Sequence, residues 1–107
     1  MATFRQTVKE ARKEIRRAAA EAGYTVSEVD LGGSDGNIIF WLVDAKGVEL
    51  SGVQVVHIQT ADGVVMSVDA VYADCTPQHE DEQYPVDYLV RQAIGIADFN
   101  AAQREAA

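Results

Sequence analysis

A histidine, a serine and an aspartate stand at positions where a sheet could bring them together. His57 lies in one predicted strand, and Ser67 and Asp69 lie in the next. A hydrolase needs these types because an acid must orient the imidazole and the imidazole must reach the hydroxyl. If a three-residue loop joins the strands, Ser67 lies directly opposite His57 and Asp69 lies diagonally from it. No oxyanion donors or enclosing cleft accompany this set, so we favour a polar surface cluster and rank a small hydrolase lowest.

The segment Gly32-x-Ser34-x-Gly36 has the letters of the nucleophile elbow of α/β hydrolases. That motif requires a sharp turn from a strand into a helix, on top of a parallel sheet. Here the glycines separate two predicted strands, and no helix follows them whose N-terminus could hold a phosphate. We therefore interpret the segment as a glycine loop and predict no catalytic residue in this chain.

The chain has few residues that could bind a metal. Cys75 and His79 lie near a run of acids, but the whole chain holds one cysteine and two histidines. A zinc site normally takes four nitrogen or sulfur ligands at recognisable spacing, and the acids lack the spacing of a calcium loop. The sequence therefore predicts no metal and no cofactor, and it predicts a solvated acidic loop over residues 74–83.

The charge is divided unevenly along the chain. Residues 1–22 carry six cations against three acids, whereas residues 23–107 carry three cations against 14 acids. On a helix the six cations occupy one arc of about 140°, beside an apolar stripe. Several are like-charge neighbours four residues apart, which costs a few tenths of a kcal/mol per pair unless something compensates. The compensation is either the chain's own acids or an external anionic partner. These cations are Arg5, Lys9, Arg12, Lys13, Arg16 and Arg17.

The elements that must position these residues follow from the hydrophobic periodicity. Apolar residues three and four apart predict helices at both ends, and alternating or continuous apolar runs predict strands between them. The predicted elements are, in order, a helix over 3–22, strands over 24–31, 37–44 and 48–60, a fourth strand after residue 63, and a helix from residue 85. We predict an α+β fold: a four-stranded antiparallel β-meander flanked by an N-terminal and a C-terminal helix (α-β-β-β-β-α). Both helices are expected on one face of the sheet, with residues 1–107 in a single globular domain.

Glycines indicate how the strands connect. Gly23 is expected to end the first helix, and Gly47 and Gly63 are each expected to close a three-residue hairpin loop. The apolar positions change parity near Ser51-Gly52, which indicates a β-bulge there and leaves the local register open. The expected pairs between the last two strands are Thr60 with Val64, Ile58 with Met66, and Val56 with Val68.

The predicted central strand is apolar on both faces. We expect Phe40, Leu42, Val56 and Val68 to face the helices. A second apolar face is then left over, and either a helix covers it or it is a homodimer or target interface with a tryptophan anchor. Its residues are Ile39, Trp41, Val43, Val53, Val55 and Val71.

Composition limits the classes of function. The formal net charge of −8 predicts poor non-specific attraction to nucleic acid or to anionic membranes. The longest apolar run, over 38–43, is too short to span a bilayer, and no apolar secretory signal is visible. A single cysteine allows no intramolecular disulfide, so we expect a reducing compartment and a cytoplasmic location.

These observations favour a non-enzymatic acidic binding protein that inhibits or escorts a macromolecular partner, most simply a protein, through charged surfaces. The expected contact residues are the six helix cations and the acids Glu80, Asp81 and Glu82. A small homodimeric structural or chaperone-like module that uses the Trp41 face is the alternative. In size and charge the chain resembles phage inhibitors of host defence (anti-CRISPR-like proteins) and bacterial toxin-immunity proteins. Its helix-then-strands order is similar to secretion-chaperone-type domains.

Overall fold

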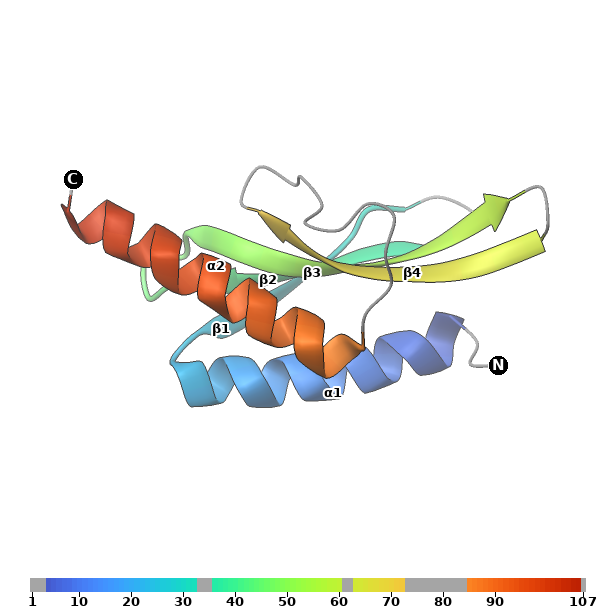
Figure 1. The fold of residues 1–107 in the computed structure, drawn as a ribbon, viewed down its shortest axis with the longest axis horizontal. Helices are drawn as coiled ribbons and strands as arrows, with labels where there is room; N and C mark the ends of the chain where they lie inside the picture. The colour runs from blue at the N-terminus through green and yellow to red at the C-terminus, as the bar shows by residue number, and fades with distance from the viewer. Residues whose placement is uncertain (1–3, 33–35, 61–62, 73–84, 107) are drawn as a thin grey trace.

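Two helices pack on one face of an antiparallel sheet (Figure 1). The computed structural model describes the backbone of residues 4–32, 36–60, 63–72 and 85–106, and the side chains of residues 7–32, 36–56 and 85–105. The elements are α1 (Phe4–Ala22), β1 (Thr25–Asp30), β2 (Asn37–Val43), β3 (Glu49–Thr60), β4 (Gly63–Tyr72) and α2 (Val86–Ala106). The strands lie in the order β1-β2-β3-β4, each antiparallel to its neighbours. An α+β fold with two helices and an antiparallel sheet is thus confirmed.

Helix α1 forms where its apolar stripe meets the sheet. Its buried residues recur three or four positions apart, so they share one face. They are Val8, Ala11, Ile15 and Ala19. The helix ends at Gly23, whose φ of 90° is a left-handed value that glycine adopts without steric cost. The N–H groups of Gly23 and Tyr24 then donate to the carbonyl oxygens of Ala20 and Ala19, at 3.2 and 2.8 Å. The predicted stripe and C-terminal glycine are confirmed.

Helix α2 follows Pro85, whose carbonyl oxygen accepts the N–H of Leu89 at 3.1 Å. Its buried stripe is Leu89, Val90, Ala93 and Ala97. Two polar contacts add to this packing. The hydroxyl of Ser51 donates to the Ala93 carbonyl oxygen at 2.5 Å, and Asn100 Nδ2 donates to the Leu50 carbonyl oxygen at 2.6 Å. Strand β3 therefore holds α2 by side-chain hydrogen bonds as well as by apolar contact.

A β-bulge in β3 decides which side chains face the helices. Leu42 pairs with Ser51, but the next residue, Val43, pairs with Glu49, so Leu50 is the extra residue. The bulge thus lies one position before the predicted Ser51-Gly52. Because of the bulge, the side chains of Leu50 and Ser51 both lie on the helix side of the sheet, and Val53 lies on the same side.

The register of β3 on β4 differs from the prediction. Thr60 pairs with Gly63, so two residues connect the strands instead of three. A one-residue slip changes every cross-strand pair. In the observed register apolar positions are still paired with apolar positions, as Ile58 is with Val65. The expected pairing of Thr60 with Val64, Ile58 with Met66, and Val56 with Val68 is therefore wrong.

The turn between β2 and β3 matches its prediction more closely. Gly47 has a φ of 82°, and its N–H donates to the Asp44 carbonyl oxygen at 3.0 Å. The Asp44 carboxylate accepts the N–H groups of Lys46 and Val48 at 2.8 and 2.9 Å. These hydrogen bonds lower the pKa of Asp44, and the bond from the Val48 N–H has the largest effect.

Neither described helix is long and apolar enough to cross a membrane.

Candidate functional site

The observed register separates the three residues that were weighed as a catalytic set and interpreted as a polar cluster. His57 pairs with Met66, Ser67 with Val56, and Asp69 with Gln54. Since successive strand residues alternate between faces, Ser67 does not lie opposite His57, and that part of the prediction is wrong. Ser34, Cys75 and His79 lie outside the described residues. Within the described ones, no three metal-binding side chains gather.

The apolar cluster around Trp41 contains three of the six predicted residues. Ile39, Trp41 and Val43 form it, with Val29 packed against it, and no described side chain of α1 or α2 belongs to it. Val53 and Val55 instead belong to the core under the helices, so their assignment to the Trp41 face is corrected. Val53 pairs with Phe40 and Val55 with Ile38, which places both on the helix side. Likewise Val56 pairs with Asn37, which places it on the side of Ile39 instead of the helix side. Val71 pairs with Gly52 through its backbone, and its side chain lies outside the described part.

Trp41 packs closely over Gly52. A Cβ atom added to Gly52 would lie 3.0 Å from Trp41 Cε3 and 3.0 Å from the Phe40 carbonyl oxygen. A glycine at this position therefore lets the indole lie on the backbone. Trp41 is only 5% exposed. It offers little surface to a partner.

The cation row of α1 is partly paired with the chain's own acids. Arg12 binds Glu28 of β1 through two parallel bonds, Nε to Oε1 at 2.7 Å and Nη2 to Oε2 at 2.9 Å. Arg16 Nη2 lies 3.5 Å from the same carboxylate. The hydrogen bond from Arg12 is the main reason that the pKa of Glu28 is lowered. The Arg12 guanidinium also lies 6.0 Å from the centre of the Phe40 ring, within range of a cation–π contact.

A third arginine is paired within α1 itself. Arg17 Nε donates to Glu14 Oε2 at 3.2 Å, and Nη1 donates to Glu21 Oε1 at 3.0 Å. These are contacts three and four residues apart on one helix face. They raise the pKa of Arg17, with the hydrogen bond to Glu14 as the largest cause. Sequence spacing alone could find this group, whereas it missed Glu28.

Two lysines remain without such partners. Lys9 and Lys13 are exposed, and neither forms an ion pair with any residue that the structure describes. The side chain of Arg5 and residues Glu80, Asp81 and Glu82 lie outside the described part. Among the described residues, the predicted contact surface therefore divides into arginines with ion pairs and lysines without them.

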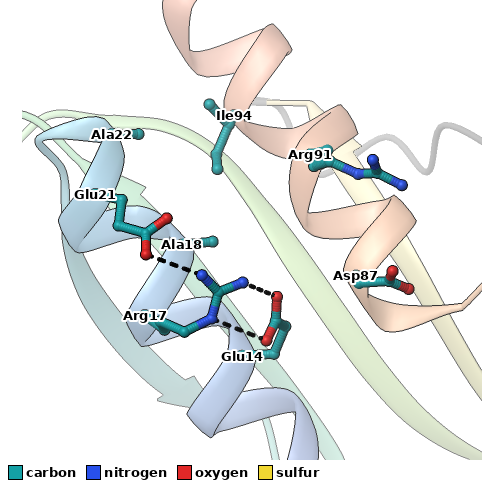
Figure 2. A pocket seen from close by; sticks show the side chains of 8 residues that line it. All are labelled: Glu14, Arg17, Ala18, Glu21, Ala22, Asp87, Arg91 and Ile94. Atoms are coloured by element: carbon teal, nitrogen blue, oxygen red, sulfur yellow. Dashed lines mark hydrogen bonds and ion pairs between the residues drawn. The ribbon is translucent and has the colours of Figure 1, made fainter.

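A groove separates the two helices (Figure 2). Its volume is about 460 Å³. Ile94 of α2 points toward α1, while Ala18 and Ala22 leave room on the other wall. Arg17 lies between Glu14 and Glu21 along the α1 rim of the groove. The side chain of Arg91, on α2, extends away from α1. The groove has apolar walls with charged rims of both signs.

A second hollow, of about 450 Å³, lies where α1 ends. The hydroxyl of Tyr24 donates to Asp98 Oδ1 at 2.5 Å, which ties the end of α1 to α2. Burial, together with this bond, raises the pKa of Tyr24 to about 12. Arg104 lies 3.9 Å from Asp44 on the same rim. Because Tyr24 holds its proton at neutral pH, the hollow has no activated base on this residue.

Comparison with protein-family models, with curated proteins and with solved structures gave no match for this chain. The functional argument therefore stands on the fold and its surfaces.

Proposed function

We propose that this chain is a non-enzymatic binding protein that inhibits or escorts a protein partner. It contacts an acidic patch of that partner through Lys9, Lys13 and Arg16 of α1. The supporting observation is the division of the cation row, in which Arg12 and Arg17 are paired with carboxylates of this chain and the two lysines form no ion pair with any described residue.

The ion pairs with Glu28 fix the position of one arginine and leave another accessible. Arg12 is held by two bonds to Glu28, and Arg16 shares that carboxylate while its side chain stays 53% exposed. Lys9 and Lys13 lie one turn apart, and their repulsion costs about 0.2–0.5 kcal/mol. No described acid relieves it, whereas a carboxylate of a bound partner would.

The net charge shapes the kind of partner. A chain of formal net charge −8 repels an extended polyanion, so a nucleic acid is less favoured than a protein with a limited acidic patch. The acids Glu80, Asp81 and Glu82 stay in the proposal as a second contact for basic groups of the same partner. We also propose a cytoplasmic partner, since a single cysteine suits a reducing compartment.

The test is partner capture followed by quantitative binding. A partner recovered on immobilised chain is purified, and its dissociation constant is measured at several salt concentrations. We expect Lys9→Glu with Lys13→Glu to weaken binding by at least about tenfold and to reduce the salt dependence. Lys46→Glu is the control, because Lys46 is an exposed lysine on the β2–β3 turn.

The outcomes are distinct. Unchanged binding in the double variant removes α1 from the proposal. Equal weakening by Lys46→Glu shows that the total charge matters and the α1 surface does not. A captured nucleic acid in place of a protein contradicts the proposed partner class.

A further inference from the structure

Two neighbouring positions on α2 have no explanation within one copy of the chain. Phe99 is 63% exposed, the larger of the two exposures among the large apolar side chains that the structure describes as exposed. Gly95 lies one turn before it, and apart from its chain neighbours and the backbone of its own helix turn, no atom lies within 4 Å of the place where its Cβ would be. Glycine weakens a helix relative to alanine, and here neither a turn nor a close contact requires it.

We propose that α2 binds α2 of a second copy of this chain in an antiparallel crossing. Each Phe99 fills the open space over the partner's Gly95. The two positions suit a two-fold axis level with Ala97, because Gly95 and Phe99 lie equally far on either side of it. In such a symmetric interface each contact occurs twice. The missing Cβ lets the ring approach the helix backbone.

The charges on α2 complement each other in this crossing. Arg91 and Glu105 both belong to the α1 side of α2, since each lines a hollow bounded by α1 residues, and the guanidinium of Arg91 extends outward from that side (Figure 2). A two-fold axis between antiparallel helices keeps each side of one helix next to the same side of the other. Arg91 then lies about 3 Å along the axis from the level of the partner's Glu105. Neither residue forms an ion pair within the described chain.

The last turn of α2 supports the same arrangement. Figure 1 shows the C-terminal end of α2 extending past the end of the sheet. Residues 102–105 are all exposed there. A helix end gains most of its stability from packing, and this one packs little within one copy. In the crossing Ala102 lies level with the partner's Gln92, so the second copy covers this turn.

The inference concerns α2 and does not rest on the proposed function. The formal net charge of −8 on each copy opposes association, so the dimer is expected at high protein concentration and at physiological salt, where repulsion is screened. Analytical ultracentrifugation over a concentration series up to about millimolar measures it, a range in which weak complexes are populated.

Phe99→Ala and Gly95→Leu are each expected to raise the dimer dissociation constant by at least about tenfold. Gly95→Leu leaves the thermal midpoint of dilute protein unchanged or higher, because leucine favours helix and meets no neighbouring atom. Leu31→Ala is the matched control, since Leu31 is the other exposed large apolar residue, at 53%, and lies after β1. It is expected to leave association unchanged.

Charge exchange tests the orientation. Arg91→Glu and Glu105→Arg each weaken the dimer, and the two together restore it. A chain that stays monomeric over the whole concentration series overturns the inference. So does a dimer that both Phe99→Ala and Gly95→Leu leave intact, or one that Leu31→Ala weakens equally. A double exchange without recovery contradicts the antiparallel crossing.

Discussion

Helices α1 and α2 cover the same face of the sheet, but they differ in how many of their exposed side chains have partners within the described chain. On α1, Arg12 reaches across to Glu28 of β1 and Arg17 is enclosed by two glutamates of its own helix. On α2, Arg91 has no ion pair in the described chain and Phe99 lies in solvent. The more highly charged helix is thus the one whose charges are largely compensated. The number of charges on a helix does not tell which of them a partner can reach.

The largest expected effect contrasts a buried with an exposed apolar residue. Ile15 on α1 is 0% exposed, and Ile15→Ala should lower the free energy of unfolding by about 2–5 kcal/mol because it leaves a cavity. Phe99→Ala on α2 should change it by less than about 0.5 kcal/mol in dilute solution. Urea denaturation at low protein concentration measures both. A loss at Phe99 as large as that at Ile15 would show that its ring packs within one copy.

The next effect concerns the bond that joins the two helices. Tyr24→Phe removes the hydrogen bond to Asp98 and should lower the free energy of unfolding by about 1 kcal/mol. The pKa of Tyr24 is raised from 10.0 to about 12 in the fold, so its contribution is complete below pH 10. It declines as the pH rises from 10 toward 12. Denaturation at pH 9 and at pH 11, values that bracket this change, should show a smaller alkaline loss in Tyr24→Phe than in the native chain.

A matched pair of glycine exchanges compares the helix backbones. Gly95→Ala should raise the free energy of unfolding by up to about 1 kcal/mol, because the site is open and helical. Ala20→Gly, at an exposed position of α1, should lower it by about the same amount. Both are measured in dilute solution by thermal denaturation. Destabilisation by Gly95→Ala would mean that this position has a packing role within one copy.

The smallest effect tests the compensation on α1. Glu28→Gln should lower the free energy of unfolding by up to about 1 kcal/mol, a modest amount because both arginines are well exposed. The pKa of Glu28 is lowered from 4.5, so its contribution is present above that pH and is lost as the pH falls through the lowered value. Acid denaturation of the variant should therefore start from a lower stability and fall less. Glu49→Gln, an exposed acid on β3 without an ion pair among the described residues, is the control and should be near neutral.

Local features were the ones that sequence reasoning located well. The apolar stripes of both helices, the helix end at Gly23 and the turn at Gly47 all depend on residues a few positions apart. The ion pairs of Arg17 are equally local, because its acids lie three and four residues away on the same helix. The partner of Arg12 was missed. It lies 16 residues away on a strand, and only the packing of α1 on β1 brings the two together.

The sheet register shows the same division. A two-residue connection and a three-residue connection between β3 and β4 both pair apolar with apolar residues, so the pattern could not choose between them. The bulge was expected one residue after Leu50, and Val53 and Val55 were assigned to the wrong face. Their face depends on their partners Phe40 and Ile38 in β2, because strand side chains alternate with a period of two.

The helices, two of the turns and the uneven charge can be found from the sequence alone, since each follows from short-range spacing and composition. The fold was needed to show which apolar residues share the core and which cations pair with described acids. Those outcomes depend on how distant segments align, and the alignment is set by the summed packing of the sheet and the helices. The basic face of α1 was visible in the sequence, but the fold was needed to show that its arginines pair with described acids and that Lys9 and Lys13 do not.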